Sequence, residues 1–136
     1  MKTNELTGAA LDWAVATCEG ATDFRYDTVA TYWVTLDGKD RALRSGWAQS
    51  YLPSTDWAQG GPIIEREKIT VAPFYERWVA APSVGELIRD GDGDCMTIAM
   101  WDSEPHFYGP TPLIAAMRCY VASKLGDNID IPEELC

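Results

Sequence analysis

The residues best suited to ligand binding lie together between positions 54 and 61. This stretch supplies hydroxyl, carboxylate and amide groups, an indole ring and paired glycines, on Ser54, Thr55, Asp56, Trp57, Gln59, Gly60 and Gly61. A helix that begins here would point backbone N–H groups at an anion, the glycines would let a ligand approach the backbone, and the indole could stack on a ring. The pattern therefore predicts a binding site for a small anionic, nucleotide-like ligand. The competing interpretation is a capped, kinked helix whose tryptophan packs against a sheet.

Catalytic chemistry finds little support in the sequence. The chain has one histidine, His106, and a catalytic base needs a nucleophile and an orienting carboxylate close by. Ser103 and Glu104 are near in sequence, but no known motif links them to the histidine. We therefore expect a loop histidine before a helix and no catalytic residue. An enzyme is a second alternative, which a pocket around His106 and Asp102 would favour.

Metal binding is not expected either. Aspartate and glycine alternate at positions 90–94, like the start of a calcium-binding loop. The EF-hand pattern then requires glycine at its sixth position and glutamate at its twelfth, where this chain has Cys95 and Trp101. One histidine and scattered cysteines also cannot make a zinc site. The sequence therefore predicts an acidic hairpin loop, no metal and no cofactor.

The charge of the chain restricts its partners. The formal net charge is −10, which argues against nucleic acid binding, because a phosphate backbone needs lysine and arginine on one face. The charge fits either simple solubility or an acidic surface that meets a basic protein. A single phosphate could still be held by Arg66, Arg77 or Arg118.

The aromatic content leaves several partners open. Six tryptophans and six tyrosines are many for 136 residues. Large rings commonly fill a core, and they are also enriched at protein interfaces. A core alone, a ligand or protein surface, and a homo-oligomer are all compatible with this composition.

The four cysteines and the apolar pattern indicate a reducing compartment. No CxxC pair is present, the first residues MKTNELTG have no apolar core typical of a signal peptide, and no apolar run approaches the ~20 residues that span a membrane. We therefore expect a cytoplasmic protein with free thiols and no membrane partner. Cys18 and Cys119 fall on apolar helix faces and are expected in the core, and Cys136 is expected to be exposed.

Two helices are strongly indicated, one near each end of the chain. The first is predicted at about 8–19, with Thr7 as its N-cap and Leu6 and Leu11 as a hydrophobic staple. The second follows an N-cap and N1 pair at 111–112 and ends at Gly126. It is apolar on most sides and is therefore expected at the centre of the domain. The tail 127–136 is expected to be frayed or docked as an extended arm.

Strands are expected in the remaining stretches. Residues 28–36 are β-branched and aromatic and precede an Asp-Gly turn, and 39–53 is compatible with a return strand or an irregular loop. Residues 69–81 and 95–101 are predicted to be two strands of one hairpin. The Gly-Gly-Pro of 60–62 predicts two short helical pieces joined at a break. The sequence thus predicts one α+β domain over 1–136, an antiparallel sheet of three to five strands packed against two or three helices.

Three blocks of the sequence resemble a known family. "ELTGAALDWAVATCEG", "STDWAQGGPIIERE" and "GPTPLIAAMRCYVASKLG" resemble the corresponding blocks of the NinX-like family of small tailed-phage proteins, and cover both ends and the centre of the chain. The layout is also similar, in outline, to the phage α-β-α sandwich domain. That second, weaker resemblance implies helices packed on an antiparallel sheet. Neither resemblance supplies a catalytic residue.

The resemblance and the residues together lead to one expectation about function. We expect a non-catalytic phage accessory protein that acts by binding in the host cytoplasm, sequestering a small anionic ligand. The alternative partner is a host protein that an acidic, aromatic surface would inhibit.

Overall fold

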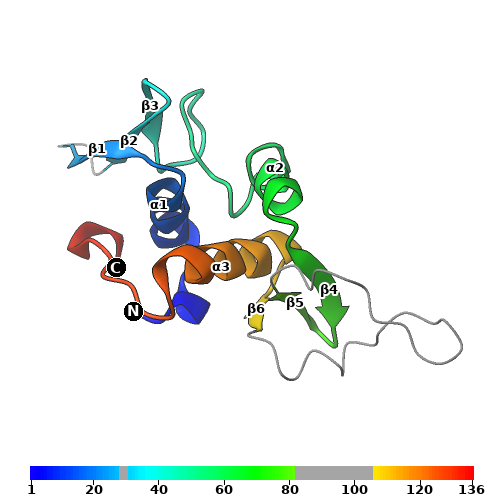
Figure 1. Cartoon of the computed structure of the whole chain (residues 1–136). Coiled ribbons are helices and arrows are strands. Elements are labelled where there is room, and N and C mark those ends of the chain that lie inside the picture. Colours follow the sequence, from blue (N-terminus) through cyan, green and yellow to red (C-terminus); the bar gives the residue numbers. More distant parts are fainter. Residues whose placement is uncertain (28–30, 82–105) are drawn as a thin grey trace, which may run out of the picture.

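The fold consists of three α-helices and two small antiparallel sheets (Figure 1). The structure is a computed structural model that describes residues 1–27, 31–81 and 106–136. In chain order, the elements of this part are η1 (Thr3–Glu5), α1 (Gly8–Cys18), β1 (Thr22–Tyr26), β2 (Tyr32–Leu36), β3 (Lys39–Ala42), α2 (Trp57–Glu67), β4 (Thr70–Phe74), β5 (Arg77–Ala81), β6 (Phe107–Gly109), α3 (Pro112–Leu125) and η3 (Glu133–Leu135).

Helix α3 is the central element, as predicted. It contacts α1, α2, η1 and all three strands of the sheet β4–β5–β6, and Figure 1 shows α1 and α2 above it and β5 and β6 below it. Its start follows the predicted chemistry, because the Thr111 hydroxyl accepts a hydrogen bond from the Ile114 amide at 3.2 Å and Pro112 is the first helical residue. Eight of its residues are buried: Leu113, Ile114, Ala115, Ala116, Met117, Cys119, Tyr120 and Val121.

Helix α1 packs its alanine-rich and branched face against α3. Leu6 and Leu11, the predicted staple, are both fully buried. Thr7 occupies the N-cap position, but its side chain makes no capping hydrogen bond. The helix ends at Cys18, one residue before the predicted end, and Gly20 follows with a φ of +88°.

The first sheet has the order β1–β2–β3, and the Phe24 ring of β1 contacts the Trp13 ring of α1 with 5.8 Å between centroids. The residues between β2 and β3 form the predicted turn, in which Asp37 and Gly38 both have positive φ. Such a pair of left-handed residues matches the right-handed twist of a hairpin. Val34 on β2 points into the core and is fully buried. The stretch 39–53, for which two forms were expected, contains both: strand β3 and then an irregular loop.

The second sheet has the order β4–β5–β6 and corrects the prediction of one strand over 69–81. The chain reverses at Tyr75 and Glu76, so that β4 and β5 form a hairpin. The prediction was wrong because this turn has no glycine, asparagine or aspartate to signal it. Tyr75 instead takes a φ of +56°. The strand predicted at 95–101 lies outside the described residues.

Helix α2 is continuous and overturns the predicted break at 60–62. Pro62 lies inside the helix, and its neighbouring glycines keep helical backbone conformations. A proline here removes one hydrogen bond to the carbonyl of Ala58, which is an exposed residue whose carbonyl water can reach. The helix therefore tolerates the proline, and the glycine beside it serves packing, as described below.

The two ends of the described chain pair with each other. Lys2 and Asn128 form an antiparallel bridge, and the Thr3 amide donates to the Asp127 carbonyl at 2.8 Å. Ile129 is buried in the main core. Of the two alternatives for the tail, the docked arm is therefore the one observed.

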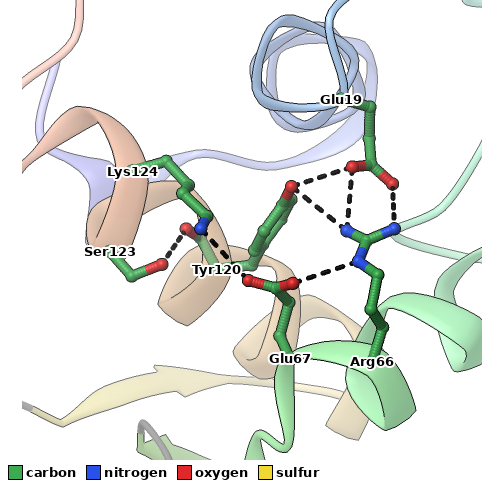
Figure 2. A network of polar contacts seen from close by, with 6 residues as sticks. All are labelled: Glu19, Arg66, Glu67, Tyr120, Ser123 and Lys124. Atoms are coloured by element: carbon green, nitrogen blue, oxygen red, sulfur yellow. Dashed lines mark hydrogen bonds and ion pairs between the residues drawn. The ribbon is translucent and has the colours of Figure 1, made fainter.

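A polar network joins the three helices (Figure 2). Arg66 of α2 meets the Glu19 carboxylate with two nitrogens at 3.0 and 2.8 Å, and the Tyr120 hydroxyl of α3 donates to the same carboxylate at 2.8 Å. Arg66 Nε also contacts Glu67, which in turn binds Lys124 at 3.2 Å. These bonds fix the C-terminal half of α2 against α1 and α3.

The α+β prediction is confirmed, with the six described strands divided between two three-stranded sheets. Among the residues described, Cys119 is buried, Cys18 is half-buried and Cys136 is exposed, all as free thiols. None of the described helices is long and apolar enough to cross a membrane.

Candidate functional site

The predicted segment 54–61 leads into α2 and is held by a hydrogen bond to a buried carboxylate of α1. Ser54 is 1 % exposed, and its amide donates to Asp12 Oδ1 of α1 at 2.9 Å. Asp12 is itself only 2 % exposed. Burial raises the pKa of Asp12 to about 6, and the hydroxyl and amide of Ser54 oppose that rise. A buried carboxylate therefore holds the loop that positions the start of α2, and Ser54 is not available to a ligand.

The N-terminus of α2 is already occupied by a negative group. The Asp56 carboxylate caps the helix by accepting from the Ala58 amide at 3.0 Å. Gln59 is equally engaged, since its oxygen accepts from the Leu52 amide at 2.7 Å and its nitrogen donates to the Ser50 carbonyl at 3.1 Å. An anion approaching these N–H groups would meet the Asp56 carboxylate, so the arrangement disfavours anion binding at this end of the helix.

The paired glycines have different roles. A Cβ on Gly60 would lie 2.2 Å from the Pro53 carbonyl oxygen and 2.6 Å from Leu113 Cδ2, so this glycine lets α2 approach the preceding loop and α3 closely. A Cβ on Gly61 would meet only Trp57, at 3.8 Å. Gly60 is therefore explained by packing between helices, without a ligand.

The accessible members of the predicted site are Thr55 and Trp57. Trp57 is 56 % exposed and belongs to none of the apolar clusters found among the described residues. Five cavities on the described part of the chain are lined by other residues. Some of the seven predicted residues thus hold the loop and the start of α2 in place, and others lie on an exposed helix face. Ligand binding at this segment stays a prediction.

A second candidate site lies where the tip of the β4–β5 hairpin meets β6 and the start of α3. A cavity of about 380 Å³ opens there, lined by Asn4, Glu76, Arg77, Tyr108, Gly109, Pro110 and Arg118. Gly109 is required by close packing, because a Cβ would lie 2.7 Å from the Ala115 amide nitrogen. The cavity wall is therefore made by tightly packed backbone and two arginines.

Arg118 is held rigidly at this cavity. Its Nε donates to the Leu6 carbonyl at 2.7 Å and its Nη1 donates to the Tyr108 carbonyl at 2.6 Å. The side chain is half-buried, and burial lowers its pKa. Within the described residues it has no carboxylate partner, and its remaining nitrogen, Nη2, makes no hydrogen bond. Its charge is thus positioned by two carbonyl dipoles and is paired with no acid among the described residues.

Arg77 lies on the other side of the same cavity. Its guanidinium stacks on the Tyr108 ring with 3.9 Å between Cζ and the ring centroid. In the described part of the chain it forms no ion pair and no hydrogen bond, although Glu76 precedes it. A guanidinium that lies over an aromatic ring still has N–H donors that can make a bidentate contact.

Of the three arginines that the sequence offered for a phosphate, two share this cavity. Arg66 is instead bound by Glu19 and Glu67 in the network of Figure 2. The sequence signal that could have separated them is local: Arg66 has glutamates on both sides, whereas Arg118 stands in an apolar helix. The chain folds Arg77 and Arg118 together from β5 and α3, which no spacing in the sequence reveals.

We call the hollow lined by Arg77 and Arg118 the arginine cavity. Its side chains are suited to binding an anion. Two guanidinium groups can hold a carboxylate or a phosphate through charge-assisted hydrogen bonds.

His106 lines a different cavity of about 310 Å³, with Lys2, Asn4, Phe107, Asp127 and Asn128. Its sequence neighbours Asp102, Ser103 and Glu104, and the aspartates of 90–94, lie outside the described residues. Among the residues that are described, no group of three or more potential metal ligands is found.

Comparison with known proteins gives a family. No curated protein matches the chain. The family model for bacteriophage P22 NinX matches residues 2–124, which spans both sheets, the three helices and the arginine cavity. This agrees with the resemblance seen in the sequence blocks, and the chain belongs to the NinX family of phage proteins.

Proposed function

We propose that this chain is a phage accessory protein that binds and sequesters a small anionic ligand in the host cytoplasm, without catalysis. The observation that supports it is the arginine cavity, where Arg77 and Arg118 have no carboxylate partner among the described residues although the chain carries a net charge of −10. In so acidic a chain, an arginine could readily be paired. Two unpaired guanidiniums facing one hollow are therefore better explained by an incoming anion.

The geometry also favours a small anion over a carboxylate-rich protein. The cavity volume of about 380 Å³ lies within the usual range for small-molecule sites. One arginine is immobilised by two carbonyls and the other by ring stacking, so little side-chain freedom is lost on binding. The lining offers hydrogen-bond donors in the two guanidiniums and no side chain placed as a nucleophile.

Isothermal titration calorimetry with inorganic phosphate and a panel of mononucleotides tests the proposal. Arg77→Gln should weaken binding at least about tenfold, because the charge-assisted hydrogen bonds of one guanidinium are removed. Arg77 makes no hydrogen bond that the fold needs, so the variant should fold normally. Arg44→Gln is the matched control, with the same charge change on the loop after β3, and should bind as the wild type does. Absence of binding to every member of the panel would refute the proposal.

A host protein is the second candidate partner, and the exposed face of α2 favours it. Trp57 is 56 % exposed, and the same face continues through Gly61 and Glu65 at helical spacing. Tryptophan is enriched among the residues that contribute most to binding at protein interfaces. Affinity capture from host lysate should retain a defined protein with the wild type, lose it with Trp57→Ala, and keep it with Trp47→Ala. Identical captures by all three would exclude this face.

Native mass spectrometry of protein purified gently from host cells distinguishes the two partners. A small added mass would support the ligand, and a co-purified protein mass would support the host factor. The same spectrum reports whether the chain forms a homo-oligomer.

A further inference from the structure

The arginine cavity has an aromatic neighbour. A second cavity of about 450 Å³ is lined by Phe74, Tyr75, Glu76 and Arg77. It shares Glu76 and Arg77 with the arginine cavity. The two hollows therefore adjoin at the tip of the hairpin, and the second one adds the rings of Phe74 and Tyr75 to the site.

Tyr75 at the hairpin tip is not explained by packing. Its side chain is 93 % exposed, and its backbone has a φ of +56°. Bulky residues rarely adopt that conformation, which costs free energy unless the surroundings compensate. Phe74 supports the ring in an edge-to-face contact, with 4.9 Å between centroids and an interplanar angle of 81°. The turn thus presents an aromatic ring to solvent where glycine would be the unstrained choice.

We infer that the ligand of the two cavities is a nucleoside monophosphate; this inference rests on the proposed anion binding and specifies its chemistry. The phosphate is held by Arg77 and Arg118, and the base stacks on Tyr75 beside Phe74. Bases stack on aromatic side chains whatever their identity. Glu76, which lines both cavities, is placed to accept a hydrogen bond from an amino group of the base.

The position of Glu76 argues for a base in addition to the anion. A carboxylate close to a site for inorganic phosphate alone would weaken binding by repulsion. A base with N–H donors would make the same carboxylate a favourable contact. It would also orient the ligand, with the base at Tyr75 and the phosphate at the arginines. The net charge of −10 repels a longer phosphate backbone, so a single nucleotide fits better than a nucleic acid strand.

Calorimetric titration with adenosine monophosphate, ribose 5-phosphate and adenosine tests this assignment. The nucleotide should bind about tenfold more tightly than ribose 5-phosphate, the increment that one stacked base supplies. Tyr75→Ala should remove that tenfold difference and leave ribose 5-phosphate binding unchanged, and Tyr75→Phe should restore it. Arg77→Gln should weaken both phosphates. Tyr26→Ala, an exposed tyrosine on the other sheet, is the matched control and should change nothing.

The outcomes separate this inference from the proposed function. Equal affinities for the nucleotide and ribose 5-phosphate, or a neutral Tyr75→Ala, would overturn the base-binding inference while the anion site stands. No binding of either phosphate would overturn both. If adenosine binds as tightly as the nucleotide, the base would be shown to bind, and the role of the arginines in holding a phosphate would be refuted.

Discussion

Substitution of the buried Asp12 by asparagine should stabilise the protein at neutral pH and not at acidic pH. Burial raises the pKa of this carboxyl from 3.8 to about 6. Asparagine keeps an oxygen that can accept the hydrogen bond from the Ser54 amide, and it carries no charge. The variant therefore removes the ionisation while it keeps the anchor of the loop before α2.

The magnitude follows from linkage between protonation and folding. The folded state binds the Asp12 proton more tightly than the unfolded state does, so the contribution of Asp12 to stability is greatest below pH 4 and falls as the pH rises toward 6. The difference between 3.8 and about 6 corresponds to about 3 kcal/mol at 1.36 kcal/mol per pH unit. Asp12→Asn should therefore match the wild type near pH 4 and exceed its free energy of unfolding by about 2–3 kcal/mol at pH 7.

Urea unfolding followed by tryptophan fluorescence at several pH values between 4 and 8 measures this difference. Asp130→Asn, at an exposed position in the C-terminal tail, is the control and should shift stability by less than about 0.5 kcal/mol at every pH. A difference between Asp12→Asn and the wild type that stays constant over this range would show that Asp12 does not titrate with a raised pKa. A variant less stable than the wild type at pH 7 would show that the charge itself is needed.

Three further predictions concern the packing of α2, the polar network and the burial of the thiols. Gly60→Ala should cost about 2–3 kcal/mol of unfolding free energy through overpacking, whereas Gly61→Ala should gain about 0.5 kcal/mol from helix propensity; equal effects in urea unfolding would contradict the packing argument. Glu19→Gln should cost about 1 kcal/mol in low salt and less in high salt; a loss that high salt leaves unchanged would exclude the ion pair as its source. Iodoacetamide should label exposed Cys136 and spare Cys119, because burial raises the pKa of that thiol to about 12; peptide mass mapping of native protein decides this.

Local signals in the sequence predicted the helix ends well and the turns less well. The start of α3 was predictable because one threonine and one proline satisfy a simple local rule, and the structure keeps both roles. The hairpin at Tyr75 could not be predicted, because its reversal depends on pairing between β4 and β5 and not on turn chemistry. The break expected at Pro62 failed for a related reason: contacts of Gly60 with Pro53 and Leu113 decide the path of α2.

The two candidate sites differ in the same way: one consists of residues adjacent in the sequence, and the other of residues that only the fold brings together. Residues 54–61 were selected because they are adjacent, and adjacency favours caps and loop anchors, which is how Ser54, Asp56 and Gln59 are used. The arginine cavity combines residues from η1, the β4–β5 hairpin, β6 and α3. The sequence indicated this cavity only through three arginines that could hold a phosphate. Which two of them lie together is decided by the fold.

The charges of the chain should give the proposed anion site a selectivity that its contacts alone would not. A net charge of −10 lowers the affinity of the whole surface for any polyanion, since every additional phosphate outside the cavity meets carboxylates. Arg118 escapes this effect because carbonyls from Leu6 and Tyr108 hold it in a half-buried position, where screening by solvent is weaker. A ligand with one phosphate gains the guanidinium contacts and incurs little of the repulsion. We therefore expect the acidity of the protein to act together with Arg77 and Arg118, which have no carboxylate partner among the described residues, in favouring a small anion over a long one.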